Sequence, residues 1–169
     1  PYQLYHAEKW DELHECISTL GYMSRQFTTN NIHEFILYWR TLKQADASKY
    51  KISQAYIEQI MGSMAEKAEM AVMLQWAYWQ MFRNDVIRLT NICISYLNDL
   101  DAAYELVEFL IRMCDQMADG DTSEERCSFH NLAGMICIRK KEYIQALKEY
   151  REGLSLAVHA YGEDDLKIT

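Results

Sequence analysis

Histidine and cysteine are the residue types in this chain best suited to nucleophilic or metal chemistry, and the sequence holds five of each. No two histidines have the H-E-x-x-H spacing and no two cysteines form C-x-x-C, the spacings that bring two metal ligands together. His14 has Glu15 and Cys16 beside it, but adjacent residues point to different sides of a helix and cannot converge on one ion. The sequence therefore predicts no metal site.

Other reactive arrangements are equally weak. A cysteine nucleophile needs a neighbouring base, and the sequence does not show which histidine lies near which cysteine. The acidic residues of segment 115–125 do not follow the twelve-residue ligand spacing of a calcium loop, so they indicate a solvated turn or a surface for basic partners. No G-x-x-x-x-G-K-[ST] phosphate loop is present. We expect no catalytic residues and no cofactor, and the chain is predicted not to be an enzyme.

Binding residues are easier to suggest. Asn84, Arg88, Asn91 and Ser95 are spaced by four, three and four residues, so on a helix they share one face. Amide groups both donate to and accept from a peptide backbone, and a guanidinium donates. These four residues are candidates for binding a peptide, and the alternative is an idle polar face.

The elements that carry these residues are predicted to be helices. The chain contains one proline and six glycines, and apolar residues recur at intervals of three and four. Thr122 and Glu125 form a helix-start signal, and Gly162 is placed to end the last long helix. The predicted helices span residues 2–19, 30–44, 53–66, 68–82, 84–98, 100–118, 123–139 and 142–161, with a short helical turn near 21–27. The aromatic segment 76–82 is interpreted as core packing or an exposed partner surface.

When the second half of the chain is aligned with itself at an offset of 43 residues, the two copies match without a gap. Leu89 then falls on Leu132, and Ala103 falls on Ala146. Two helix–turn–helix copies at this period are typical of a solenoid, in which each unit buries its apolar face on its neighbour. The prediction is an all-α helical-repeat solenoid of antiparallel helix pairs, with repeats at about 84–121 and 123–164 and the start of a further one.

The repeat resembles the tetratricopeptide repeat, and in particular the longer repeats of kinesin light chains and nephrocystin-3. The matching segments are Asn131-Leu132-Ala133, Tyr143-Ile144-Gln145-Ala146 and Tyr161-Gly162-Glu163-Asp164. The resemblance implies a right-handed solenoid whose first helices line a concave groove for a peptide. It adds His130, Asn131 and Gly134 to the candidate peptide-binding residues, because related repeats use the asparagine to hold a ligand's backbone and Gly134 would let that backbone approach.

Residues 1–83 are predicted to be a helical region that precedes or caps the repeats of residues 84–169. Trp10 to Leu13 and Tyr38-Trp39-Arg40 resemble helices that precede such repeats in NACHT-type NTPases. The chain could then be a regulatory or assembly arm that packs against its own parent chain.

Charge narrows the class of partner. The net charge is −8, and residues 84–169 hold nine Lys and Arg against sixteen Asp and Glu. A nucleic-acid-binding protein needs a basic face, so nucleic acid is not expected as a partner. No apolar run is long enough to insert into a membrane, and an odd number of scattered cysteines favours the cytoplasm.

The predicted function is a protein–protein interaction scaffold that binds a peptide or protein segment. The alternative is the arm of a NACHT-type NTPase, and an all-helical enzyme is a third hypothesis. The helix at 142–161 is expected to expose Leu147, Leu154 or Val158 and to allow self-association.

Overall fold

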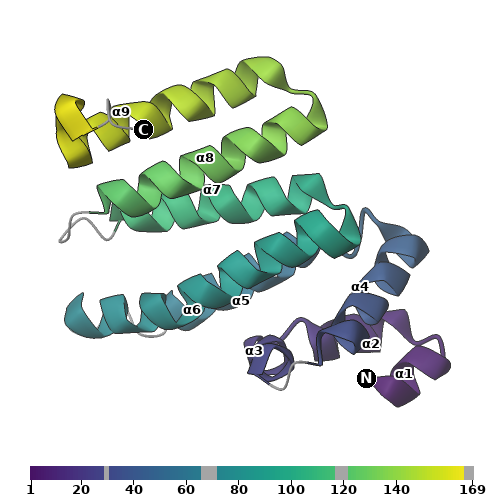
Figure 1. The fold of residues 1–169 in the computed structure, drawn as a ribbon. Coiled ribbons are helices and arrows are strands. Elements are labelled where there is room, and N and C mark those ends of the chain that lie inside the picture. Colours follow the sequence, from purple (N-terminus) through teal and green to yellow (C-terminus); the bar gives the residue numbers. More distant parts are fainter. Residues whose placement is uncertain (29–30, 66–71, 117–121, 166–169) are drawn as a thin grey trace. The chain divides into compact units, whose positions relative to one another are not determined.

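The computed structural model describes residues 1–28, 31–65, 72–116 and 122–165, and all of the elements described there are helices (Figure 1). The predicted all-α class is confirmed for these residues. In chain order the elements are α1 (Tyr2–His6), α2 (Trp10–Ile17), α3 (Leu20–Thr28), α4 (Ile32–Asp46), α5 (Ile52–Ala65), α6 (Val72–Ile92), the π-helical turn η1 (Cys93–Leu97), α7 (Leu100–Gln116), α8 (Ser123–Lys140) and α9 (Tyr143–Asp165).

The chain divides into two compact units, residues 1–102 and residues 103–169. The first unit contains α1 to α6 and η1, and the second contains most of α7 together with α8 and α9. The boundary expected from the sequence, between residues 83 and 84, lies inside α6.

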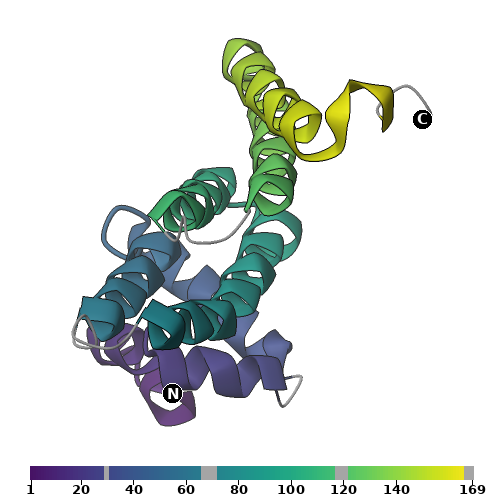
Figure 2. The same ribbon diagram turned by 90° about the vertical axis from the view of Figure 1, so that its left-hand side faces the viewer.

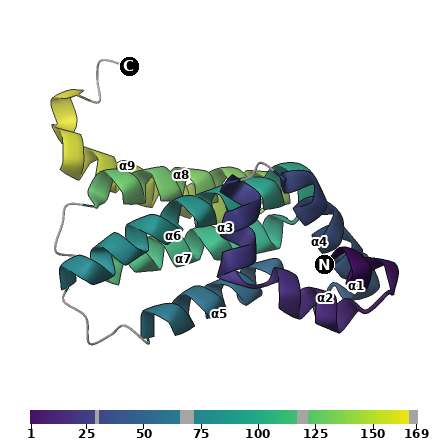
Figure 3. The ribbon, with the colours of Figure 1, turned by 90° about the horizontal axis from the view of Figure 1, so that it is seen from below.

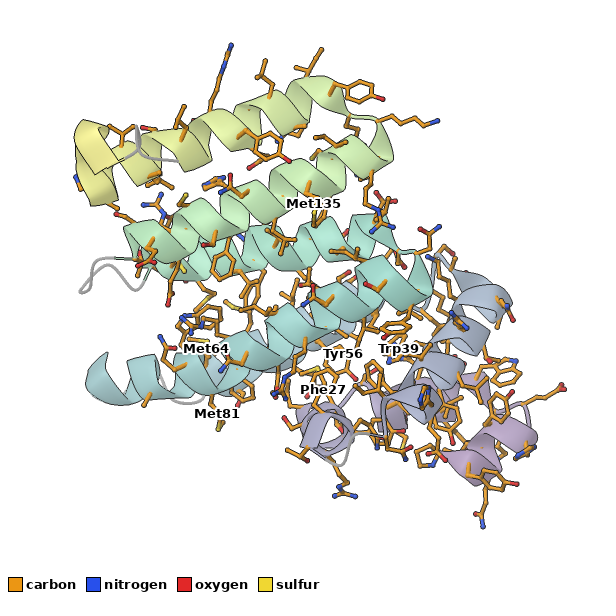
Figure 4. All side chains as sticks on the ribbon, viewed as in Figure 1. Phe27, Trp39, Tyr56, Met64, Met81 and Met135 are labelled. Carbon is orange, nitrogen blue, oxygen red and sulfur yellow. The ribbon has the colours of Figure 1, made fainter. Side chains whose placement is uncertain are left out.

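Aromatic side chains form the core of the first unit. Phe27, Trp39 and Tyr56 come from α3, α4 and α5, and Figure 4 shows them gathered in one region. The rings of Trp39 and Tyr56 have their centroids 6.0 Å apart. Helix α3 crosses α5 and α6 and packs on both of them (Figure 3). This core holds α6 in place while one side of α6 stays open to solvent.

Two predicted helix boundaries in the first unit are wrong. Helix α6 runs without a break from Val72 to Ile92, although separate helices were expected at 68–82 and 84–98. No glycine or proline lies near residues 82–84, so nothing in the sequence there interrupts a helix. The predicted helix at 2–19 is instead two helices, because Glu8 between α1 and α2 takes a positive φ of 56°.

The second unit is built on a helical hairpin in which α9 lies alongside α8 (Figures 1 and 2). The turn between them is short, with Lys141 in the left-handed conformation at φ 65°. Ala103 and Ala146 are buried, as predicted for helix crossings. Gly162 does not end α9, which continues to Asp165, so that prediction is wrong. A glycine inside a helix lowers its stability without forcing it to stop.

The 43-residue period is visible in the backbone. Asn98 and Lys141, which are 43 residues apart, both follow a helix and both have positive φ, 49° and 65°. The helices after them begin at Leu100 and Tyr143, again 43 residues apart. Burial follows the same period, since several pairs of equivalent residues are buried in both copies: Val86 and Phe129, Thr90 and Ala133, Cys93 and Ile136, Ala103 and Ala146, and Cys114 and Ala157.

The sequence raised two apolar surfaces, the aromatic segment 76–82 and the helix at 142–161, and the structure shows how exposed each of them is. In the aromatic segment, Trp79 and Phe82 are buried and Met81 is exposed, while the side chains of Trp76 and Tyr78 lie outside the described residues. On α9, Leu147 and Leu154 are exposed as predicted.

Candidate functional site

The four candidate residues on α6 and η1 are all open to solvent. Asn84, Arg88 and Asn91 lie on α6, Ser95 lies on η1, and each is exposed. Their spacing places them along one side of the helix, opposite the residues that face the core. We call these four residues the α6 stripe.

An exposed, largely apolar side chain lies next to each end of the α6 stripe. Met81 lies one turn before Asn84 and is 56% exposed, and Tyr96 lies directly after Ser95 and is 54% exposed. Figure 4 shows the Met81 side chain projecting outward from α6. Arg, Met and Tyr side chains are enriched at protein interfaces relative to the rest of the surface. The α6 stripe is therefore a polar row between two exposed apolar contacts.

Contacts beneath the stripe fix its position. The Asp85 carboxylate accepts a hydrogen bond of 2.7 Å from the Ser24 hydroxyl on α3 and lies 3.9 Å from the Arg88 guanidinium. At the other end, Arg40 of α4 donates two hydrogen bonds to the carbonyl oxygen of Tyr96, at 2.6 and 3.3 Å. The stripe thus rests on a helix that α3 and α4 hold at both ends.

In the second unit the structure separates the three predicted residues of α8. Asn131 is exposed, and its amide donates to Cys127 Sγ at 3.7 Å. Gly134 is buried beneath the ring of Tyr150, and a Cβ atom placed there would lie only 2.8 Å from that ring. No ligand backbone can approach Gly134 from that side, so its expected role is corrected. The missing side chain instead lets the Tyr150 ring of α9 pack closely against α8.

The 43-residue shift predicts Cys127, Asn131, Gly134 and Ile138 on the face of α8 that is equivalent to the α6 stripe. Of these, Asn131 and Ile138 are exposed, Cys127 is half-buried and Gly134 is buried. Ser128 and Met135 are exposed instead, and Figure 4 shows Met135 on this helix. The spacing alone could not distinguish the two sets, because intervals of three and four are satisfied equally well by two neighbouring faces.

His130, the third predicted residue, belongs to a buried polar cluster that joins α7, α8 and α9. Its Nδ1 donates to Glu149 Oε2 at 2.9 Å. Glu149 Oε1 accepts hydrogen bonds from the Tyr104 hydroxyl at 2.8 Å and from the Gln145 amide at 2.6 Å. Glu149 is only 7% exposed, so a carboxylate with three donors lies in the interior of the unit.

These contacts set the ionisation of the cluster. Burial by itself would raise the pKa of Glu149, but the hydrogen bonds from His130, Tyr104 and Gln145 outweigh it and hold the pKa below its usual value. The pKa of the Tyr104 hydroxyl is raised, first by burial and then by its bond to Glu149. At neutral pH the carboxyl is ionised and the phenol keeps its proton.

A cavity of about 230 Å³ adjoins this cluster. Sequence reasoning missed it, because its residues are distant in the chain. The one available signal was the 43-residue shift, which places Glu149 on the buried Leu106. The cavity is lined by Glu108, Ile111, Arg112, His130 and Glu149.

Metal and thiol chemistry gain no support from the described residues. Within ranges 1–28, 31–65, 72–116 and 122–165, no group of three His, Cys, Asp or Glu side chains could hold a metal ion. All five cysteines are free thiols, and burial raises the pKa of Cys93 and Cys137. Part of the acidic segment 115–125 lies outside the described residues. In the described part, Asp115 Oδ1 forms an ion pair with Arg126 Nη2 at 2.8 Å.

None of the helices in the described part of the chain combines the length and apolar character needed to cross a membrane. No protein-family model, no curated protein and no solved structure matches the chain.

Proposed function

We propose that this chain is a protein-binding module of helical repeats, and that it binds a peptide or protein segment through the α6 stripe. The observation that carries the proposal is the stripe itself, a row of exposed amide, guanidinium and hydroxyl groups between Met81 and Tyr96. A bound backbone could accept from Arg88 and exchange hydrogen bonds with Asn84 and Asn91. The buried aromatic core below the stripe supports it rigidly.

The tetratricopeptide-repeat identity, with its right-handed solenoid and concave groove, belongs to the same proposal. Its support is the 43-residue period, seen in the left-handed residues Asn98 and Lys141 and in the burial pattern. In the second repeat the exposed binding residues are then Asn131 and its neighbours on α8. Self-association through α9 and a cytoplasmic location are part of the proposal too, the latter supported by five free thiols.

The partner class follows from charge. The net charge of −8 favours basic protein segments and disfavours nucleic acid. The role of an arm on a NACHT-type NTPase stays an alternative within this proposal, in which the bound segment comes from the parent chain.

Site-specific photo-crosslinking tests the proposal. A benzophenone amino acid is placed at Asn91 in the stripe and, as the matched control, at Gln54, which is exposed on α5. We expect Asn91 to crosslink in cells to a discrete protein that Gln54 does not reach. Equal crosslinking from both positions, or none from either, contradicts the proposal. A crosslink to the parent chain identifies the arm.

A further inference from the structure

The buried polar cluster of the second unit occupies positions that are apolar in the first repeat. Under the 43-residue shift, Glu149 corresponds to Leu106, which is fully buried, and Gln145 corresponds to Ala102. A buried carboxylate in place of leucine needs its partners to offset the cost of removing its charge from water. Departures of this kind from a consistent repeat mark sites where function was favoured over packing.

The cluster holds His130 at the wall of the cavity. A carboxylate can only accept, so the 2.9 Å contact requires His130 Nδ1 to carry a proton. The same ring lines the cavity. Glu149 thereby fixes the tautomer and the orientation of the ring.

The charged residues of the lining determine which ligand charge the cavity favours. Glu108 and Glu149 are negative and Arg112 is positive, so carboxylates outnumber the guanidinium in the lining. Ile111 supplies an apolar wall. At about 230 Å³ the cavity is smaller than the roughly 300–1,000 Å³ of pockets for drug-sized ligands. It therefore fits one long side chain better than a whole cofactor.

We propose that this cavity binds the basic side chain, lysine or arginine, of a partner polypeptide. The cationic head donates to the Glu108 carboxylate, and the methylene stem lies against Ile111. The site lies on α7, α8 and α9 and not on the α6 stripe, so it goes beyond the proposed function and does not depend on it.

Ligand titration followed by NMR tests the site in the full chain. The probes are the blocked amino acids N-acetyl-arginine methylamide and N-acetyl-lysine methylamide. The matched controls are the norleucine analogue, which lacks the charge of lysine, and the glutamate analogue, which reverses it. We expect saturable shifts of the His130 ring signals with both basic probes and binding at least about tenfold weaker with norleucine.

Two variants locate the binding. Glu149→Leu installs the residue of the first repeat and should abolish the response, and Glu108→Gln, at an exposed position, should weaken it without disturbing the fold. Arg88→Ala should leave it unchanged, which separates this site from the α6 stripe. Equal or tighter binding of the glutamate analogue, the absence of any saturable shift, or unchanged binding in both cavity variants would overturn the proposal.

Discussion

Glu149 is a buried carboxylate at a position where the 43-residue shift places a buried leucine, Leu106. Its side chain accepts hydrogen bonds from residues of three helices. A buried charge with satisfied partners contributes little net stability but is costly to disturb from one side only. The polar cluster therefore orients His130 and makes the second unit sensitive to any change at this position.

A variant that removes only the charge of Glu149 measures how strongly the stability of the second unit depends on it. Glu149→Gln keeps the shape but removes the charged acceptor, and we expect the free energy of unfolding to fall by about 2 kcal/mol. Glu152→Gln is the matched control, because Glu152 lies on the same helix and is exposed. It should change stability by less than about 0.5 kcal/mol. Urea denaturation of both variants makes the comparison, and equal effects would show that the cluster is not a structural unit.

Acid should remove the stability that the Glu149 carboxylate contributes to the fold. The pKa of Glu149 is lower in the folded chain than its usual value, so the carboxylate stabilises the fold above the unfolded pKa, and this stability is lost as the pH falls through the folded pKa. The difference in unfolding free energy between wild type and Glu149→Gln should be fully present at pH of about 5 and should shrink below about 4. A difference that grows towards acid pH would contradict the assigned ionisation.

At the scale of elements, the α8–α9 hairpin depends on a close approach of its two helices. Gly134 on α8 receives the ring of Tyr150 from α9, which leaves no room for a Cβ atom. Gly62 in α5 has open space around it. The two glycines thus occupy helix interiors for different reasons, and only one of them is required by packing.

An alanine at each position separates these reasons. Gly62→Ala should raise the free energy of unfolding by about 1 kcal/mol, because it improves helix propensity without a clash. Gly134→Ala should lower it by about 1 kcal/mol, because the ring of Tyr150 must move. Thermal melting of the two variants tests the packing, and a stabilised Gly134→Ala variant would show that α8 and α9 do not meet there.

The same elements show how far the sequence could predict the structure. Helix content, the 43-residue period and the buried Ala103 and Ala146 follow from local spacing, so they could be read from the residues. The burial of Gly134 could not, because it depends on Tyr150, which lies on another helix. The cluster of Tyr104, His130 and Glu149 could not be assembled either, because spatial pairing of distant residues leaves no periodic trace.

At the scale of the whole molecule, exposed apolar residues on α9 indicate a surface that another helix could cover. Ile144 is 90% exposed, and Leu147 and Leu154 follow it at intervals of three and seven residues. This spacing forms a narrow seam of the kind that pairs helices.

Sedimentation equilibrium tests this pairing. We expect the chain to reach twice its mass of 20.0 kDa as concentration rises, and Leu147→Glu with Leu154→Glu to keep it monomeric, because charges would then lie in the seam. Leu37→Glu on α4 is the matched control, since Leu37 is also exposed, and it should dimerise normally. A wild-type chain that stays monomeric at millimolar concentration would rule out self-association through α9.

The binding function itself is the central claim, and a calorimetric titration of the partner crosslinked at Asn91 tests it most directly. The purified partner is titrated into wild type and into the double variant Arg88→Ala, Asn131→Ala, with the melting temperature of each chain measured in parallel. We expect the variant to bind at least about tenfold more weakly with an unchanged melting temperature, because both side chains are exposed. An unchanged dissociation constant would contradict the claim.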